Sequence, residues 1–94
     1  MQIAEYEADK LATKREGMVV SMRQCRLALL AEGTLANVDI AIASLPEPDK
    51  SAAQVEWEYA ATVQRTSPFV ASLGMAIGYD DVKMDALFEA AADL

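Results

Sequence analysis

Residue types that commonly carry out chemistry are scarce in this chain of 94 residues. It has no His, which removes the commonest general base and the commonest zinc ligand. Cys25 is the single Cys, and it lacks the His partner on which most Cys enzymes depend. No Gly-rich stretch fits a phosphate-binding loop or a dinucleotide fingerprint. Because free Cys is usually buried, we expect Cys25 to be a core residue and the protein to be a non-enzyme without cofactor or metal.

Four carboxylates form the one regularly spaced group of charges: Asp81, Asp85, Glu89 and Asp93. Residues four apart share one face of an α-helix, so these side chains would line a single ridge. Such an acidic ridge could be a docking strip for a basic partner, an imitation of nucleic-acid phosphates, or a weak divalent-cation site. A solvated face opposite an apolar stripe is the more frequent reason for this pattern, and we favour it.

Two aromatic residues in the middle of the chain are further candidates for contact with a partner. Trp57 and Tyr59 are two positions apart, so they leave a helix on opposite sides. One ring can then lie in the core while the other is partly exposed, as interface anchors often are. A core ring with its polar tip in water fits the same pattern. Glu56 and Glu58 also point to different sides, so they do not form a catalytic pair.

The charge of the chain restricts its partners. Eight Lys and Arg residues against fifteen Asp and Glu residues give a net charge of −7. Nucleic-acid phosphates and anionic lipids attract clustered Lys and Arg, so we expect neither a nucleic acid nor a membrane as partner. Residues 22–45 have the outline of a helix-turn-helix, but the segment that would read DNA has no cation. An αα-hairpin therefore fits this segment better.

Targeting signals and disulfides are not evident in the sequence. A single Cys excludes an internal disulfide framework and suits a reducing compartment. No apolar run approaches the ~20 residues of a membrane span. The acidic start, MQIAEYEADK, lacks the basic-then-apolar order of a signal peptide. We expect the protein to reside in a cytoplasm.

The spacing of apolar residues predicts an all-α fold. We expect a compact orthogonal array of about five short helices in residues 20–94, preceded by an arm or marginal helix in residues 1–19. A long central helix over Ser51–Arg65 would organise the array. Its buried stripe would consist of Ala52, Val55, Tyr59 and Val63. The other helices are expected at residues 22–32, 35–44, 68–77 and 81–93, and no stretch gives a strand signal.

Several helix boundaries have specific signals. Ser21 is placed to begin a capping box, and Ser67 and Asp80 are placed to cap the last two helices. Gly78 is expected to end the helix that precedes it. The last helix should bury a stripe that consists of Met84, Leu87, Phe88 and Ala91.

Four segments occur in a familiar order and spacing: RQCRLALL, VEWEYA, RTSPFV and the terminal MDALF. Together they resemble the C-terminal segment of small proteins that bacteriophages and prophages encode near their tail-fibre genes. The resemblance covers nearly all of residues 20–94, whereas the N-terminal segment lies outside it. It implies a phage origin and a part in tail assembly, and the family has no catalytic residues to transfer.

The resemblance and the composition lead to one expected function and one alternative. We expect a non-enzymatic structural or chaperone-like assembly protein that contacts a phage tail component or a second copy of itself, as a homo-oligomer. The candidate contact residues are the two aromatic side chains and the ridge: Trp57, Tyr59, Asp81, Asp85, Glu89 and Asp93. The alternative is an acidic inhibitor of a host nucleic-acid-binding protein. The expected location is the cytoplasm of the bacterial host, or the virion.

Overall fold

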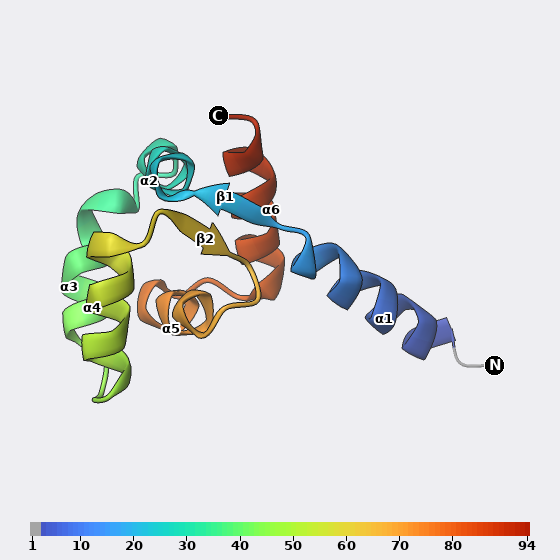
Figure 1. The fold of residues 1–94 in the computed structure, drawn as a ribbon, viewed down its shortest axis with the longest axis horizontal. Coiled ribbons are helices and arrows are strands. Elements are labelled where there is room, and N and C mark those ends of the chain that lie inside the picture. Colours follow the sequence, from blue (N-terminus) through green and yellow to red (C-terminus); the bar gives the residue numbers. More distant parts are fainter. Residues whose placement is uncertain (1–2) are drawn as a thin grey trace.

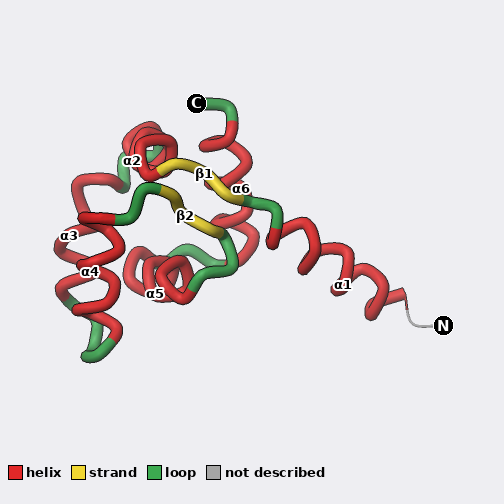
Figure 2. The backbone as a smooth tube through the Cα atoms, in the orientation of Figure 1, coloured by secondary structure: helices red, strands yellow, loops and turns green. Residues whose placement is uncertain are grey.

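The structure, a computed structural model, describes the backbone of residues 3–94 and the side chains from Lys10 onward. Helices make up most of this part of the chain, and two short strands pair beside them (Figure 1, Figure 2). The helices are α1 (Ile3–Glu16), α2 (Met22–Ala31), α3 (Val38–Ala43), α4 (Asp49–Tyr59), α5 (Pro68–Ile77) and α6 (Asp81–Ala92). A 3₁₀ turn over Leu35–Asn37 leads into α3, and the strands are β1 (Val19–Ser21) and β2 (Thr62–Gln64).

The prediction of an all-α fold is confirmed in part: the described residues are mostly helical, but two strands also occur, so the prediction that no strand occurs is wrong. The expected central helix over Ser51–Arg65 is also wrong in its second half. α4 ends at Tyr59, Ala60 is extended with φ −68° and ψ 134°, and β2 follows. The chain therefore leaves the helix well before Arg65 and crosses the molecule as a strand (Figure 2).

The two strands form an antiparallel pair with Val20 opposite Val63 at its centre. Both valines are buried, whereas Val19, Thr62 and Gln64 beside them are exposed. Branching at Cβ makes Val and Thr fit extended backbone better than helix, and the alternation of buried and exposed residues suits a strand. These local preferences allow a strand at residues 60–65, but they do not reveal its pairing partner, which is remote in the sequence.

α4 turns a different face inward from the predicted one. Its buried residues are Ala53 and Trp57, one turn apart, and α3 and α5 pack beside it. Of the predicted stripe, Ala52, Val55 and Tyr59 are exposed, with 56% of Val55 and 78% of Tyr59 accessible, and only Val63, which lies in β2, is buried. The helix therefore leaves apolar side chains in contact with water.

Trp57 joins α4 to several neighbouring helices. Its Nε1 donates a hydrogen bond to Oδ1 of Asp39 in α3 at 3.0 Å. The guanidinium of Arg26, from α2, lies 3.8 Å from the centre of the indole, and the ring of Phe69, from α5, lies tilted against it at 6.5 Å. These contacts fix α4 against three other helices through one side chain.

The predicted caps at Ser21, Ser67 and Asp80 are confirmed. Ser21 Oγ accepts a hydrogen bond from the backbone N–H of Gln24 at 3.0 Å, and the Gln24 side chain accepts one from the N–H of Ser21. Ser67 and Asp80 accept bonds from the first turns of α5 and α6 in the same way. The predicted stripe of α6 is buried in the core, where it meets α2: Met84, Leu87, Phe88 and Ala91.

Substitution of Gly78 tests whether the positive φ at the end of α5 requires glycine. It has φ +76°, and a Cβ added there would meet no atom within 4 Å, so any cost of Gly78→Ala comes from the backbone alone. We expect this substitution to lower the free energy of unfolding by about 1 kcal/mol, measured by urea denaturation. Gly17→Ala is the control, because Gly17 does not have positive φ and the new Cβ would make an ordinary contact at 3.5 Å. Equal stability of the two variants would contradict the expectation.

Candidate interaction site

α6 carries the predicted acidic ridge on the side away from its buried stripe. Asp81, Asp85 and Glu89 lie within the helix, and Asp93 is its C-cap residue. The cap at the other end is Asp80, whose carboxylate accepts from the N–H of Lys83 at 2.8 Å. The structure thus brings the four ridge residues onto one helix face, as their spacing predicts.

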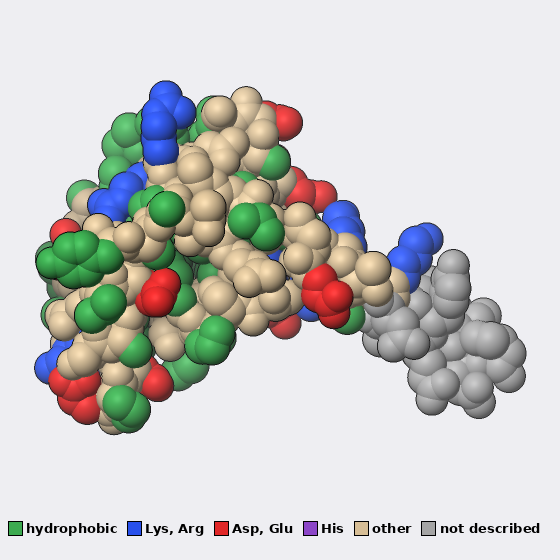
Figure 3. All heavy atoms as spheres, in the orientation of Figure 1, with side chains coloured by type: hydrophobic (Ala, Val, Ile, Leu, Met, Phe, Trp, Pro, Cys, Tyr) green, Lys and Arg blue, Asp and Glu red, His purple; other side chains and the backbone are tan. Residues whose placement is uncertain are grey.

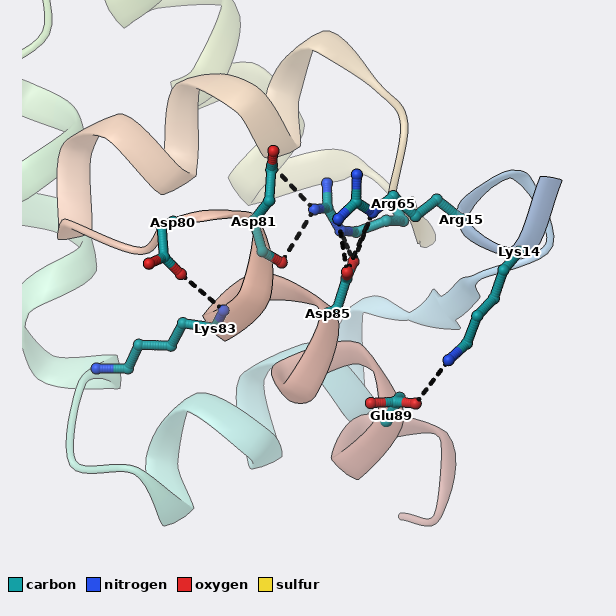
Figure 4. Close-up of polar contacts among 8 residues, drawn as sticks. All are labelled: Lys14, Arg15, Arg65, Asp80, Asp81, Lys83, Asp85 and Glu89. Carbon is teal, nitrogen blue, oxygen red and sulfur yellow. Dashed lines mark hydrogen bonds and ion pairs between the residues drawn. The ribbon is translucent and has the colours of Figure 1, made fainter. Parts of the chain in front are cut away.

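Asp85 lies between two arginines from distant parts of the chain (Figure 4). Arg15, at the end of α1, donates from Nε to Oδ1 at 3.0 Å and from Nη2 to Oδ2 at 2.8 Å. Arg65, directly after β2, donates from Nε to Oδ1 at 2.8 Å. Charge-assisted bonds of this forked kind are stronger than bonds between neutral groups. One carboxylate therefore joins α1, the end of β2 and α6.

Arg65 is the one buried charged residue in the part of the chain that the structure describes, with 8% of its surface accessible. Besides its bond to Asp85, it donates from Nη2 to Oδ1 of Asp81 at 3.1 Å. A buried guanidinium without acceptors would destabilise the fold by several kcal/mol. The ridge carboxylates are thus what allow Arg65 to lie beneath α6.

The outer part of the ridge makes a weaker contact. Glu89 forms an ion pair with Lys14 at 3.2 Å, and more than half of each side chain is accessible, so the pair adds little stability. Asp93 is exposed and makes no ion pair with any described residue. α1 projects from the globule (Figure 1), and Arg15 is the only residue from Lys10 to Gly17 that is not exposed, so this part of the chain buries little surface.

The arginines also change the acidity of the cluster. Hydrogen bonds from Arg15 are the largest cause of a lowered pKa at Asp85, and Arg65 lowers it further, against the opposing effect of burial. The bond to Asp85 in turn raises the pKa of Arg15. Each partner favours the charged form of the other, so the cluster is ionic at neutral pH.

The two candidate aromatic residues have different environments. Trp57 is buried, as the contacts above require, and Tyr59 is the exposed last residue of α4. Figure 3 shows hydrophobic side chains mixed with carboxylates over the α3–α4 end of the molecule. Sequence reasoning missed a groove between α4 and α5, lined in part by Ala52, Val55 and Phe69. The sequence contains a signal for this groove, because the small residues Ala52 and Ala53 lie between acidic residues on α4. We missed it because Ala52 was predicted to belong to the buried stripe.

Cys25 is buried, as predicted, with 1% of its surface accessible. Burial raises the pKa of its thiol to about 11, so the reactive thiolate is scarce at neutral pH.

Within the described residues, no three His, Cys, Asp or Glu side chains are grouped so that they could hold a metal ion. Of the helices in residues 3–94, none combines the length and the apolar character needed to cross a membrane.

Comparison with known proteins identifies no relative: no family model, curated protein or solved structure matches the chain. The phage origin and the part in tail assembly that the resemblance implies therefore stay predictions.

The position of Asp85 predicts an unequal effect of substitutions along the ridge. Asp85→Ala removes acceptors from two guanidiniums, one of them buried, and we expect it to lower the free energy of unfolding by about 2–3 kcal/mol. Asp93→Ala changes the net charge equally but breaks no ion pair, and we expect a change below about 0.5 kcal/mol. Urea denaturation of both variants measures the difference. A similar loss in both would show that the ridge acts only through its total charge.

The same contacts predict how stability varies with pH. Because the pKa of Asp85 is lower in the folded protein than its usual value of 3.8, the stabilisation is present above that value and is lost as the pH falls through the folded pKa. We expect the wild type to exceed Asp85→Asn in stability at about pH 7, and the difference to shrink at about pH 3. Comparing the two proteins at each pH cancels the titration of the other carboxylates. A difference that is constant or larger in acid would contradict the role given to Asp85.

Proposed function

We propose that the protein is a non-enzymatic, tail-associated structural or assembly-accessory protein of a bacteriophage or prophage, which acts by protein–protein contacts. Two lines of support are independent of each other. The phage setting is supported by the resemblance at RQCRLALL, VEWEYA, RTSPFV and MDALF. The mode of action is supported by the apolar face that α4 exposes.

The exposed face of α4 is the observation that carries the proposal. Val55 and Tyr59 lie one turn apart on the side opposite Trp57, and both are more than half accessible. Because Trp57 contacts α2, α3 and α5, these two side chains project from a helix whose opposite face is packed into the core. An exposed aromatic residue beside an aliphatic one is the kind of anchor that contributes most to protein interfaces.

The alternative function has less support from the geometry. An inhibitor that imitates nucleic-acid phosphates needs carboxylates free to meet a basic protein. Three ridge residues, Asp81, Asp85 and Glu89, are already paired with cations of the same chain. We therefore favour a contact through the apolar face, made in the cytoplasm of the bacterial host during particle assembly.

Deleting the gene from the phage or prophage that encodes it tests the proposal. We expect particles with missing or defective tails by electron microscopy, and normal tails when the wild-type protein is supplied. A Val55→Ala/Tyr59→Ala variant should restore infectious particles at least about tenfold less well, because it removes the exposed anchors. The control is Met75→Ala/Val82→Ala, which truncates apolar side chains on α5 and α6 that are 75% and 77% exposed and should restore infectious particles fully.

Two results would contradict the proposal. One is normal, infectious tailed particles in the absence of the protein. The other is equal restoration by both double variants, which would leave the α4 face without a role. Circular dichroism and thermal unfolding of each purified variant show that the substitutions leave the fold intact.

A further inference from the structure

The groove between α4 and α5 has an apolar lining. Its volume is about 480 Å³, within the range of ~300–1,000 Å³ that is typical of binding pockets. Ala53 and Phe69 are buried beneath it, while Ala52, Val55 and Pro68 are exposed along its sides. An apolar side chain that entered the groove would be removed from water, and this burial would favour binding.

Two carboxylates stand at the α4 side of this groove. Asp49 and Glu56 both line it, and they are seven residues apart on α4. Seven residues are about two helical turns, so the two side chains lie on the same edge of the helix and about 10 Å apart along its axis. Ala52 and Ala53 occupy the turn between them. The arrangement is thus an apolar floor with an acid at each end.

These two acids differ from those of the α6 ridge. Neither Asp49 nor Glu56 forms an ion pair with any residue that the structure describes, whereas Asp85 is held by Arg15 and Arg65. Their charges are therefore available to a partner, and those at the centre of the ridge are not. The surface suited to a basic partner therefore lies on α4, not on α6, although the charge spacing of α6 suggested a docking strip there.

We propose that the α4–α5 groove binds an amphipathic helix of another protein. This helix inserts one large apolar side chain, such as Leu, between two Lys or Arg residues about two turns apart. The apolar contact supplies affinity, and the pairing of its cations with Asp49 and Glu56 sets its orientation. The inference rests on the proposed function and names the kind of partner that the groove takes; the groove shares Val55 with the exposed face of α4. A second copy fits poorly, because it would bring a chain of net charge −7 against these carboxylates.

A designed peptide tests the groove directly. The probe is an Ala-rich helical peptide with one Leu, a Lys four residues before it and a Lys three residues after it. We expect chemical-shift changes in ¹H–¹⁵N spectra of the labelled full chain to centre on Ala52, Val55, Phe69 and Ser72, with a dissociation constant near or below about 1 mM. Replacing Leu by Ser, or both Lys by Glu, should weaken binding at least about tenfold.

Matched variants separate the groove from the general acidity of the chain. Asp49→Asn/Glu56→Gln removes the two groove charges and should weaken binding of the Lys peptide about tenfold. Glu58→Gln/Asp93→Asn removes the same number of charges outside the groove and should change binding less than about twofold. Thermal unfolding of both variants confirms that α4 still folds.

Four outcomes would overturn the inference: no binding at millimolar peptide, shifts centred on the α6 ridge, equal weakening by the two double variants, or shifts at the groove that depend on protein concentration without peptide. The last would identify a second copy as the occupant. Any of these together with tail defects in the deletion phage rejects the groove and keeps the proposed function. Peptide binding at the groove without tail defects in the deletion phage would keep the groove as a binding site and reject the proposed function.

Discussion

The pairing of Asp85 with Arg15 and Arg65 is the interaction on which the assembly of this small fold depends. Arg65 directly follows β2 and is buried beneath α6, where a guanidinium is tolerated only because carboxylates accept its hydrogen bonds. Arg15 uses the same carboxylate to hold the end of α1, where the other residues from Lys10 to Glu16 are exposed. The contact therefore ties the first helix, the strand pair and the last helix together at one point.

The acidic residues at the centre of the α6 ridge and those beside the α4–α5 groove consequently have different roles. Those at the centre of the α6 ridge neutralise cations of the same chain, and their contribution is to stability. Those beside the α4–α5 groove, Asp49 and Glu56, form no ion pair with any described residue and border an apolar surface. The orientation of α4 produces this division, because Trp57 draws one face of the helix into the core and leaves Val55 outside.

Features set within one or two helical turns could be predicted from the sequence, and features set by remote pairing could not. The caps at Ser21 and Asp80 and the buried stripe of α6 follow from local spacing, and the structure confirms them. β2 was missed because Val63 is held by Val20 from a distant segment. The burial of Arg65 was missed for the same reason, since its acceptors lie on another helix. The ridge was located correctly, but its internal partners were not visible in the spacing of its charges.

A double-mutant cycle between Arg65 and Asp85 tests the central claim most directly. The free energies of unfolding of Arg65→Met, Asp85→Asn, the double variant and the wild type give the interaction energy of the two side chains, free of the separate effects of each substitution. We expect a favourable coupling of about 1–3 kcal/mol at neutral pH and low salt. A coupling near zero would show that the two groups act independently, and that Asp85 does not hold the strand pair and the last helix together.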